Sequence, residues 1–196
     1  MSASTHEERV LGAIEREGMI LVQDARLPSL ATMVAGEPIS GSWWGHSQGK
    51  TIFNVIEAIE DDRDVARFKL LDGKVCLVHR ALWPSLACIG RSRQRWQLEG
   101  LSTFASDLYE RVERGERVEE SGPHVKELET RLLCVGDQRH TESGAHVTEL
   151  VSWKVFAKEH GVSLKLRSAD KAKAQVEAIV GRWATQHGRR AKLPWP

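Results

Sequence analysis

The stretch VARFKLLDGKVCLVH (residues 65–79) consists of two β-rich runs joined by Asp72-Gly73. Asp-Gly tolerates the positive φ angles that a tight two-residue turn requires. The flanking runs are rich in the apolar and β-branched residues that favour strands. The stretch therefore predicts an antiparallel β-hairpin. A lone hairpin is marginally stable in water, so the segments around it must supply the core that covers it.

Helices and one short strand are expected before the hairpin. They are a helix at residues 6–17, a strand at 19–22, a helix at about 28–35 and a helix at about 50–60. The last is the clearest, because its apolar residues follow the i, i+3, i+4, i+7 pattern of a buried helical stripe. The residues of that stripe are Ile52, Val55, Ile56 and Ile59. Helix, strand, helix, helix, hairpin is the order of a winged-helix unit, which we therefore predict over residues 6–79.

The second half of the chain repeats the apolar pattern of the first at an offset of 98 residues. The positions in register are Val10 with Leu108, Ile14 with Val112, Ile20 with Val118, Leu30 with Leu128, Val34 with Leu132, Ile52 with Leu150, and Val55 with Trp153. Self-similarity across several elements indicates two related units. We therefore predict a helix-rich α+β fold of two tandem winged-helix-like units, residues 1–96 and 97–196, related by an internal repeat.

The second unit is expected to differ from the first in its C-terminal elements. Leu150 and Trp153 are expected on its third helix, and the hairpin is expected to be lost. The segment VSLKL (162–166) is then expected to supply one strand, and a basic helix at about 169–186 to follow it.

The composition is that of an ordinary globular protein, with 41% hydrophobic and 28% charged residues. No apolar run approaches the roughly 18 residues of a membrane span, and the polar start MSASTHEERV is unlike a signal peptide. Three cysteines in apolar surroundings are typical of reduced core thiols, so we expect a cytoplasmic protein without membrane contact. Strong zinc spacings, phosphate-binding glycine motifs and hydrolase motifs are missing, so no metal and no cofactor is expected.

Charge is distributed unevenly along the chain. Residues 1–72 contain 7 Lys and Arg against 12 Asp and Glu, whereas residues 161–196 contain 8 against Asp170 and Glu177. Such an asymmetry indicates an anionic partner for the C-terminal part, and nucleic acid, DNA in particular, is the partner that we expect. A solvated helix face followed by a basic tail is the alternative.

Two segments carry the residues expected to contact nucleic acid. In GSWWGHSQGK (41–50), one of two adjacent indoles is expected to pack and the other to be exposed, where it can stack on a base. In RSRQR (91–95), arginines alternate, so an extended linker would present their guanidinium groups to phosphates on one side. The predicted nucleic-acid-binding residues are Trp43, Trp44, Lys50, His79, Arg80, Arg91, Arg93 and Arg95. The alternatives are a tryptophan pair that fills the gap between the units and an ordinary charged linker.

The stretch RHTESGAHVTELVSW (139–153) holds the candidate catalytic residues. A carboxylate that orients an imidazole suits general acid–base chemistry, whereas the spacing H-x-E-x-x-x-H is not a recognised zinc pattern. The offset of 98 residues places this Gly/His loop opposite the one that contains His46. The candidate catalytic residues are therefore His46, His140, Glu142 and His146. Helix capping and backbone hydrogen bonds are the alternative, and the sequence leaves open whether the protein is an enzyme.

An acidic run, Glu57–Asp62, lies on the helix that reads the major groove in winged-helix proteins. Carboxylates there are repelled by phosphate, which argues against simple duplex reading. Three hypotheses therefore stand. The protein binds nucleic acid, in DNA repair or processing; or it is an enzyme acting on a small anionic substrate in a His/Arg/Glu cleft between the units; or it is a non-catalytic interaction domain whose acidic helix docks a protein.

Three segments resemble an uncharacterised group of bacterial proteins: AGEPISGSWWGH (35–46), VHRALWPSL (78–86) and ELETRLLCVGDQRHTESGAHVTELVSW (127–153). The order of elements also resembles the tandem winged-helix proteins that include DNA glycosylases for alkylated or crosslinked bases. Some of those carry a Gln-x-Gln catalytic motif, but Gln23 has no glutamine two residues away. The resemblance thus implies an architecture suited to nucleic acid, without the glycosylase reaction.

Overall fold

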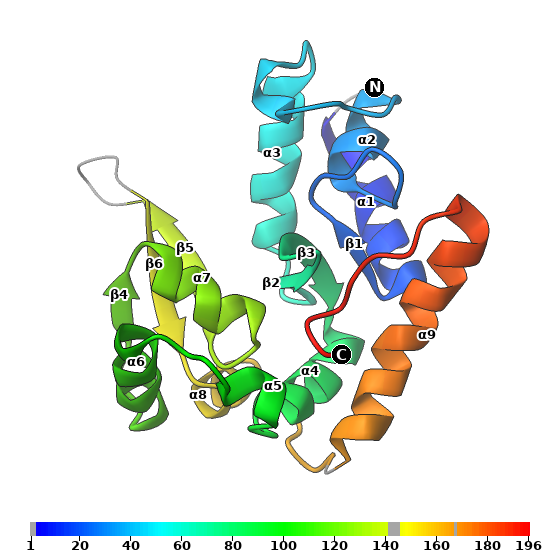
Figure 1. The fold of residues 1–196 in the computed structure, drawn as a ribbon. Coiled ribbons are helices and arrows are strands. Elements are labelled where there is room, and N and C mark those ends of the chain that lie inside the picture. The colour runs from blue at the N-terminus through cyan, green and yellow to red at the C-terminus, as the bar shows by residue number, and fades with distance from the viewer. Residues whose placement is uncertain (1–2, 141–145, 167) are drawn as a thin grey trace.

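The computed structural model describes residues 3–140, 146–166 and 168–196. The chain is 52% helical and 15% strand, with two small three-stranded sheets, which confirms the expected helix-rich mixture. Figure 1 shows one sheet in each half of the chain, with the C-terminal helix running back along the first half. Within the described part of the chain, no helix combines the length and the apolar character needed to cross a membrane.

The first half contains the elements expected before and within the hairpin. They are α1 (Ala3–Glu17), β1 (Met19–Leu21), α2 (Leu30–Ala35), the 3-10 helix η1 (Trp43–Gly45), α3 (Gly49–Glu60), β2 (Val65–Leu71) and β3 (Lys74–His79). The predicted turn is present, because Asp72 and Gly73 have φ angles of 52° and 67°. The strands form an antiparallel sheet of order β1-β3-β2.

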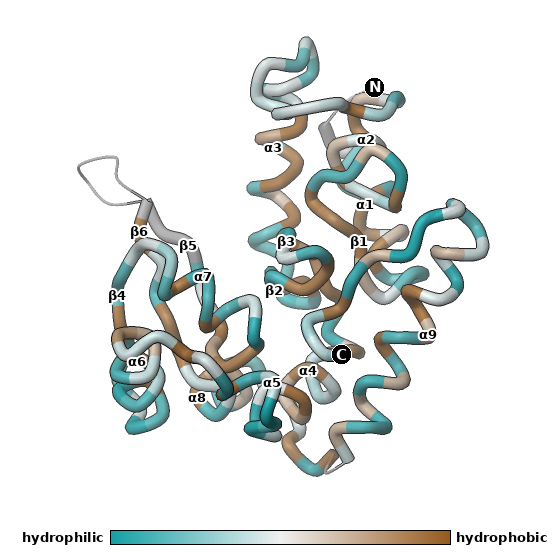
Figure 2. Tube along the Cα trace, viewed as in Figure 1, coloured by the Kyte–Doolittle hydropathy of each residue, from teal (hydrophilic) through white to brown (hydrophobic). Residues whose placement is uncertain are grey.

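Local signals set both ends of α2. Ser29 begins α2 by accepting a hydrogen bond from the Thr32 N–H, and Gly36 ends it in the left-handed conformation with φ 80°. The buried stripe of α3 packs against α1 in a core that also contains Val10 and Ile14. Figure 2 shows apolar stretches along α1, α3 and the strands of this half.

The second half is connected by η2 (Arg80–Leu82), α4 (Trp83–Gly90) and α5 (Arg95–Leu98). It continues with α6 (Thr103–Glu113), β4 (Val118–Glu120), α7 (Pro123–Thr130), β5 (Val135–His140), β6 (His146–Val151), α8 (Trp153–Glu159) and α9 (Ala169–His187). Its sheet has the order β4-β6-β5 and is antiparallel.

Three expectations for the second half are wrong. The hairpin is kept as β5 and β6, and the missing element is the third helix, because only residues 131–134 join α7 to β5. Leu132 in this connection has φ 55°, which ends helical geometry at once. The spacing of Leu150 and Trp153 had suggested a helix, but Leu150 lies on strand β6 and Ser152 caps a new helix at Trp153. The segment 162–166 is not a strand.

The offset of 98 residues matches buried positions through three pairs of elements: α1 with α6, β1 with β4, and α2 with α7. Both sheets also place their first strand beside their third. The correspondence ends at α3, which has no counterpart in the described part of the second half.

Large aromatic residues join the two halves. Phe68 from β2 stacks on Trp153 with ring centroids 5.4 Å apart, and Trp83 from α4 contacts Phe156 edge to face. The Trp153 indole N–H donates to the Leu132 carbonyl at 2.7 Å. A shared aromatic core of this kind makes the two halves one packing unit.

The C-terminal helix α9 packs on the first half although it follows the second in sequence. It lies against α4, and the Trp183 indole N–H donates to Glu17 on α1 at 3.3 Å. Figure 1 shows the tail after α9 returning toward the β2–β3 hairpin. There the Asp72 N–H donates to the Lys192 carbonyl at 2.9 Å, so the tail is held against the hairpin turn.

Candidate anion-binding cleft

A cleft of about 830 Å³ is lined mainly by the first half of the chain, and Lys126 on α7 and Arg189 after α9 also line it. Its walls come from the segment after β1, the segment before η1, the β2–β3 hairpin, α7 and the tail after α9. Four cationic residues line it: Lys69, Lys74, Lys126 and Arg189. Among the described lining residues, Asp24 is the one carboxylate. A concave surface with such an excess of positive charge attracts anions.

The four cations come from three separate parts of the chain: the β2–β3 hairpin, α7 and the tail after α9. Lys69 lies on β2, and Lys74 is the first residue of β3 after the Asp72-Gly73 turn. Lys126 lies on α7 of the second half. Arg189 reaches the cleft because Gly188, with φ 65°, ends α9 and reverses the chain.

Asp24 fixes two of these cations. Its side chain is 1% exposed and accepts hydrogen bonds from Lys74 Nζ at 2.7 Å and from Arg189 Nη1 at 2.9 Å. The N–H groups of Arg26 and Leu27 donate to the same carboxylate at 2.9 and 3.0 Å. Burial by itself raises the pKa of Asp24, but the hydrogen bond and charge of Lys74 and the two N–H groups together lower it. Asp24 is therefore ionised and orients Lys74 and Arg189.

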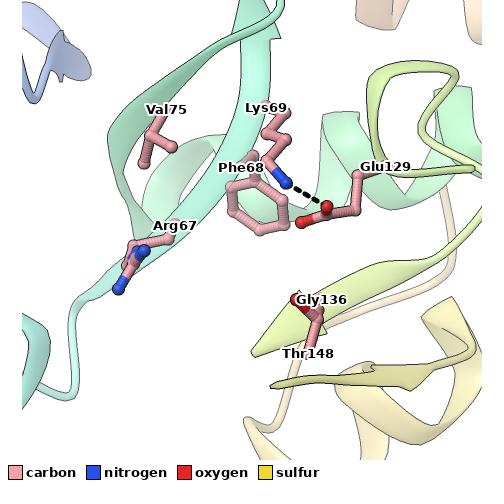
Figure 3. Close-up of a pocket in the computed structure, with 7 residues that line it drawn as sticks. All are labelled: Arg67, Phe68, Lys69, Val75, Glu129, Gly136 and Thr148. Atoms are coloured by element: carbon pink, nitrogen blue, oxygen red, sulfur yellow. Dashed lines mark hydrogen bonds and ion pairs between the residues drawn. The ribbon is translucent and has the colours of Figure 1, made fainter. Parts of the chain in front are cut away.

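Lys69 is paired across the two halves. It forms an ion pair with Glu129 on α7, shown in Figure 3 beside a small cavity of about 80 Å³. Gly136 on β5 allows this approach, because a Cβ atom there would lie 2.6 Å from Glu129 Oε1 and 2.7 Å from Thr148 Cγ2. Lys69 lines both this cavity and the large cleft, so it stands where the two join.

Lys126 differs from the other three cations. It is exposed, and no carboxylate pairs with it among the residues that the structure describes. An incoming anion therefore meets in Lys126 a charge that none of the described carboxylates neutralises.

One member of the tryptophan pair lines the cleft. Trp43 lines the cleft and is 9% exposed, whereas Trp44 is 65% exposed, which confirms that one indole packs while the other faces solvent. The two rings stack with their centroids 4.1 Å apart. The Gln23 side-chain amide donates to the Gly41 carbonyl and ties this segment to the one after β1.

A second cavity, of about 380 Å³, has the opposite charge. Its ionisable lining residues are Glu60, Arg67, Arg117, Asp137, Glu149, Glu159 and His160. Burial first, and then the nearby Asp137 and Glu57 carboxylates, raise the pKa of Glu60, although Arg67 opposes them. Carboxylates outnumber arginines here, so this cavity does not suit phosphate.

The residues that the sequence predicts for binding do not gather in one place. Lys50 is in the first turn of α3, and His46, beside that end of the helix, pairs with Glu37 at 3.3 Å. At the other end, Arg80 pairs with Asp64 at 2.7 Å. The twelve residues of α3 put about 18 Å between these ends. His79 accepts a hydrogen bond from the Ala81 N–H and caps η2.

The expectation of an extended arginine linker is wrong. Arg91 is the C-cap of α4, Arg93 has φ 50° in a turn, and Arg95 begins α5. Arg93 donates to the Tyr109 hydroxyl at 3.0 Å and pairs with Glu113, while Arg95 makes two hydrogen bonds to Glu99. The three guanidinium groups therefore do not form a row, because the segment folds into helix ends rather than a strand.

The predicted equivalence of the two Gly/His loops is also wrong. The loop with His46 leads into helix α3, whereas His140 and His146 are paired ends of strands β5 and β6. Glu142 and the side chains of both histidines lie outside the described residues. In the parts of the chain that are described, no group of three His, Cys, Asp or Glu residues is arranged to hold a metal ion.

Sequence reasoning missed Asp24 and all four cleft cations. The uneven charge distribution signalled an anionic partner, and Lys74 stands next to the predicted turn, but no spacing links these residues to one another. Searches among models of protein families, curated proteins and solved structures find no match to this chain.

Proposed function

We propose that the protein binds nucleic acid, with DNA as the expected form, through the cationic cleft. The observation that carries the proposal is the convergence of Lys69, Lys74, Lys126 and Arg189 from the β2–β3 hairpin, α7 and the tail after α9 on one concave surface. Phosphate contacts supply most of the affinity in sequence-independent nucleic-acid binding, and lysine and arginine provide them. A role in DNA repair or processing, in the cytoplasm, is the wider setting that we propose.

The architecture supports this proposal. We propose that residues 1–96 form a winged-helix-like unit, because the order α1-β1-α2-α3-β2-β3 and the sheet β1-β3-β2 are those of such a unit. We propose that residues 97–196 contain a reduced unit that keeps the hairpin and lacks the third helix. The cleft then lies between the wing of the first unit and α7 of the second.

The electrostatics set the expected salt dependence. If all four cations contact phosphates, the slope of log K against log salt is about −2.8 for a single strand and about −3.6 for a duplex. Three of the four already face carboxylates, so we expect smaller absolute slopes than these. Lys126 is expected to contribute its full share of about 0.7 to 0.9.

A binding titration tests the proposal. Fluorescence anisotropy of a labelled oligothymidylate and of a duplex of equal length is followed over about 50 to 200 mM salt. Lys126→Ala is expected to weaken binding and to reduce the slope by about 0.7 to 0.9. Lys158→Ala is the matched control, because Lys158 is an exposed lysine on α8 that does not line the cleft.

Two outcomes contradict the proposal. One is the absence of binding to both nucleic acids at the lowest salt concentration. The other is equal weakening by Lys126→Ala and Lys158→Ala, which would mean that binding reflects diffuse positive charge rather than the cleft. Protein docking through the exposed acids of the Glu57–Asp62 run would then become the leading hypothesis.

A further inference from the structure

Trp44 is a large apolar side chain left in water. It is 65% exposed, although an aromatic ring of this size contributes strongly to stability when it is buried. Trp43 stacks on it with ring centroids 4.1 Å apart and an interplanar angle of 23°. The ring centroid of Phe53 on α3 lies 5.5 Å from that of Trp44. The indole is therefore supported by two rings while much of its surface is open to a ligand.

The exposed indole stacks on a residue of the cationic cleft. Trp43 lines the cleft, and Trp44 is in direct ring contact with Trp43. A stacking surface beside a positively charged groove is the combination that single-stranded nucleic acids require, because a strand offers unpaired base faces and phosphates together.

The tryptophan segment is held in place by its neighbours. Ser42 accepts a hydrogen bond from the Trp44 N–H, and Gly49 closes the loop onto α3. A Cβ atom at Gly49 would lie 3.0 Å from the Trp44 carbonyl oxygen and 3.1 Å from that of Trp43. Because these contacts fix the loop before any ligand arrives, little ordering cost is expected on binding.

The C-terminal end of α3 disfavours a duplex seated along that helix. The helix that would enter a major groove, α3, has Glu57 exposed in its last turn and Asp61 exposed just after it. These carboxylates oppose the phosphates of a duplex seated along α3. A duplex also keeps its base faces stacked inside, so it offers Trp44 only its terminal pair.

We propose that the ligand of the cleft is single-stranded nucleic acid, with one base stacked on Trp44 and the adjoining phosphates held by the cleft lysines. This inference rests on the proposed function, and it adds the form of the ligand and the residue that selects it. Stacking recognises any base, so binding is expected to depend little on sequence.

Anisotropy titrations with labelled oligothymidylate, oligoadenylate and a duplex of equal length test the inference. The strands are expected to bind more tightly than the duplex. Trp44→Ala is expected to weaken strand binding about 5- to 150-fold, the range of one lost stacking contact, and Trp44→Phe to restore part of it. Phe104→Ala is the matched control, because Phe104 is a 52% exposed aromatic residue on α6 that does not line the cleft.

The outcomes separate the inference from the function beneath it. Equal or tighter duplex binding, or strand binding by Trp44→Ala at wild-type strength, overturns the inference. If Lys126→Ala still weakens binding in that case, the cleft keeps its proposed function with a different ligand form. Failure of every nucleic acid to bind overturns both.

Discussion

Arg189→Ala is the substitution for which the structure gives the clearest expectation. Arg189 follows the end of α9 and joins three segments that are far apart in sequence. Its Nη1 donates to both oxygens of Asp24 at 2.9 Å, and its Nη2 pairs with Asp72 at 3.2 Å. Removing the guanidinium group deprives a carboxylate that is 1% exposed of one of its two cationic partners.

The magnitude follows from what remains around Asp24. A buried charge left without a partner costs about 3 to 5 kcal/mol. Here Lys74 and the N–H groups of Arg26 and Leu27 still donate to the carboxylate. We therefore expect a loss of about 2 kcal/mol in the free energy of unfolding, within the range for hydrogen bonds to charged groups. For a chain of this length, that lowers Tm by about 4 to 8 °C.

Urea unfolding monitored by circular dichroism measures this loss. Arg190→Ala is the matched control, since Arg190 is the next residue and is exposed, so its effect is expected to stay within about 0.5 kcal/mol. The double variant with Asp24→Asn is expected to lose less than the two single variants combined, because both remove the same interaction. If the Arg189 and Arg190 variants are equally stable, the interpretation of Asp24 as a fixed anchor is refuted.

Three further outcomes are expected. Gly90→Ala should lower the free energy of unfolding in urea by about 1 to 3 kcal/mol, because the added Cβ would lie 1.9 Å from Trp153 Nε1. Gly181→Ala is its control and should be neutral or stabilising, because the added Cβ meets open space on α9. Because the pKa of Asp24 is lowered on folding, its contribution to the free energy of unfolding is complete above the unfolded pKa of 3.8 and is lost as the pH falls through the folded pKa. The stability difference between wild type and Asp24→Asn should therefore shrink on acidification. A difference that grows would contradict this expectation. Burial raises the pKa of the Cys76 thiol to about 12, so a thiol reagent should modify it at pH 8 only in step with unfolding.

The parts of the fold that the sequence predicts well are those set by neighbouring residues. Asp72-Gly73 specifies its turn wherever the hairpin packs, and the stripe of α3 specifies which face is buried. The second half was harder to predict, because Leu150 and Trp153 have a spacing that fits a helix. That spacing arises instead from a strand followed at once by a new helix capped by Ser152.

The arginines of residues 91–95 show why a charge pattern does not specify a surface. Their alternation defines one face only if the backbone is extended, and backbone conformation is decided by packing. Gly90 lets α4 approach Trp153 closely, and the chain then turns through Arg93 into α5. The spacing of the arginines predicts neither the close approach of Gly90 to Trp153 nor the turn at Arg93.

The cationic cleft depends entirely on chain reversals and contacts between distant segments. Of the basic residues after position 160, Arg189 is the one that lines the cleft among those described, and it does so because Gly188 turns the tail back. Lys173, on α9, instead lies over the rings of Trp96 and Trp195. The charge gradient therefore predicts a kind of partner, which stays a prediction, and it could not indicate the surface.

The carboxylates in and beside the cleft explain how its cations can serve both stability and binding. Asp24 and Glu129 hold Lys74, Arg189 and Lys69 close together. Without these carboxylates, repulsion among the three cations would oppose that arrangement. A phosphate that enters must share these cations with the carboxylates, so each contributes less than a free lysine does. Lys126 contributes without such competition. Lys126→Ala is therefore expected to weaken binding without the loss of stability that accompanies Arg189→Ala. If Lys126→Ala both weakened binding and lowered the free energy of unfolding as Arg189→Ala does, this division of roles would be contradicted.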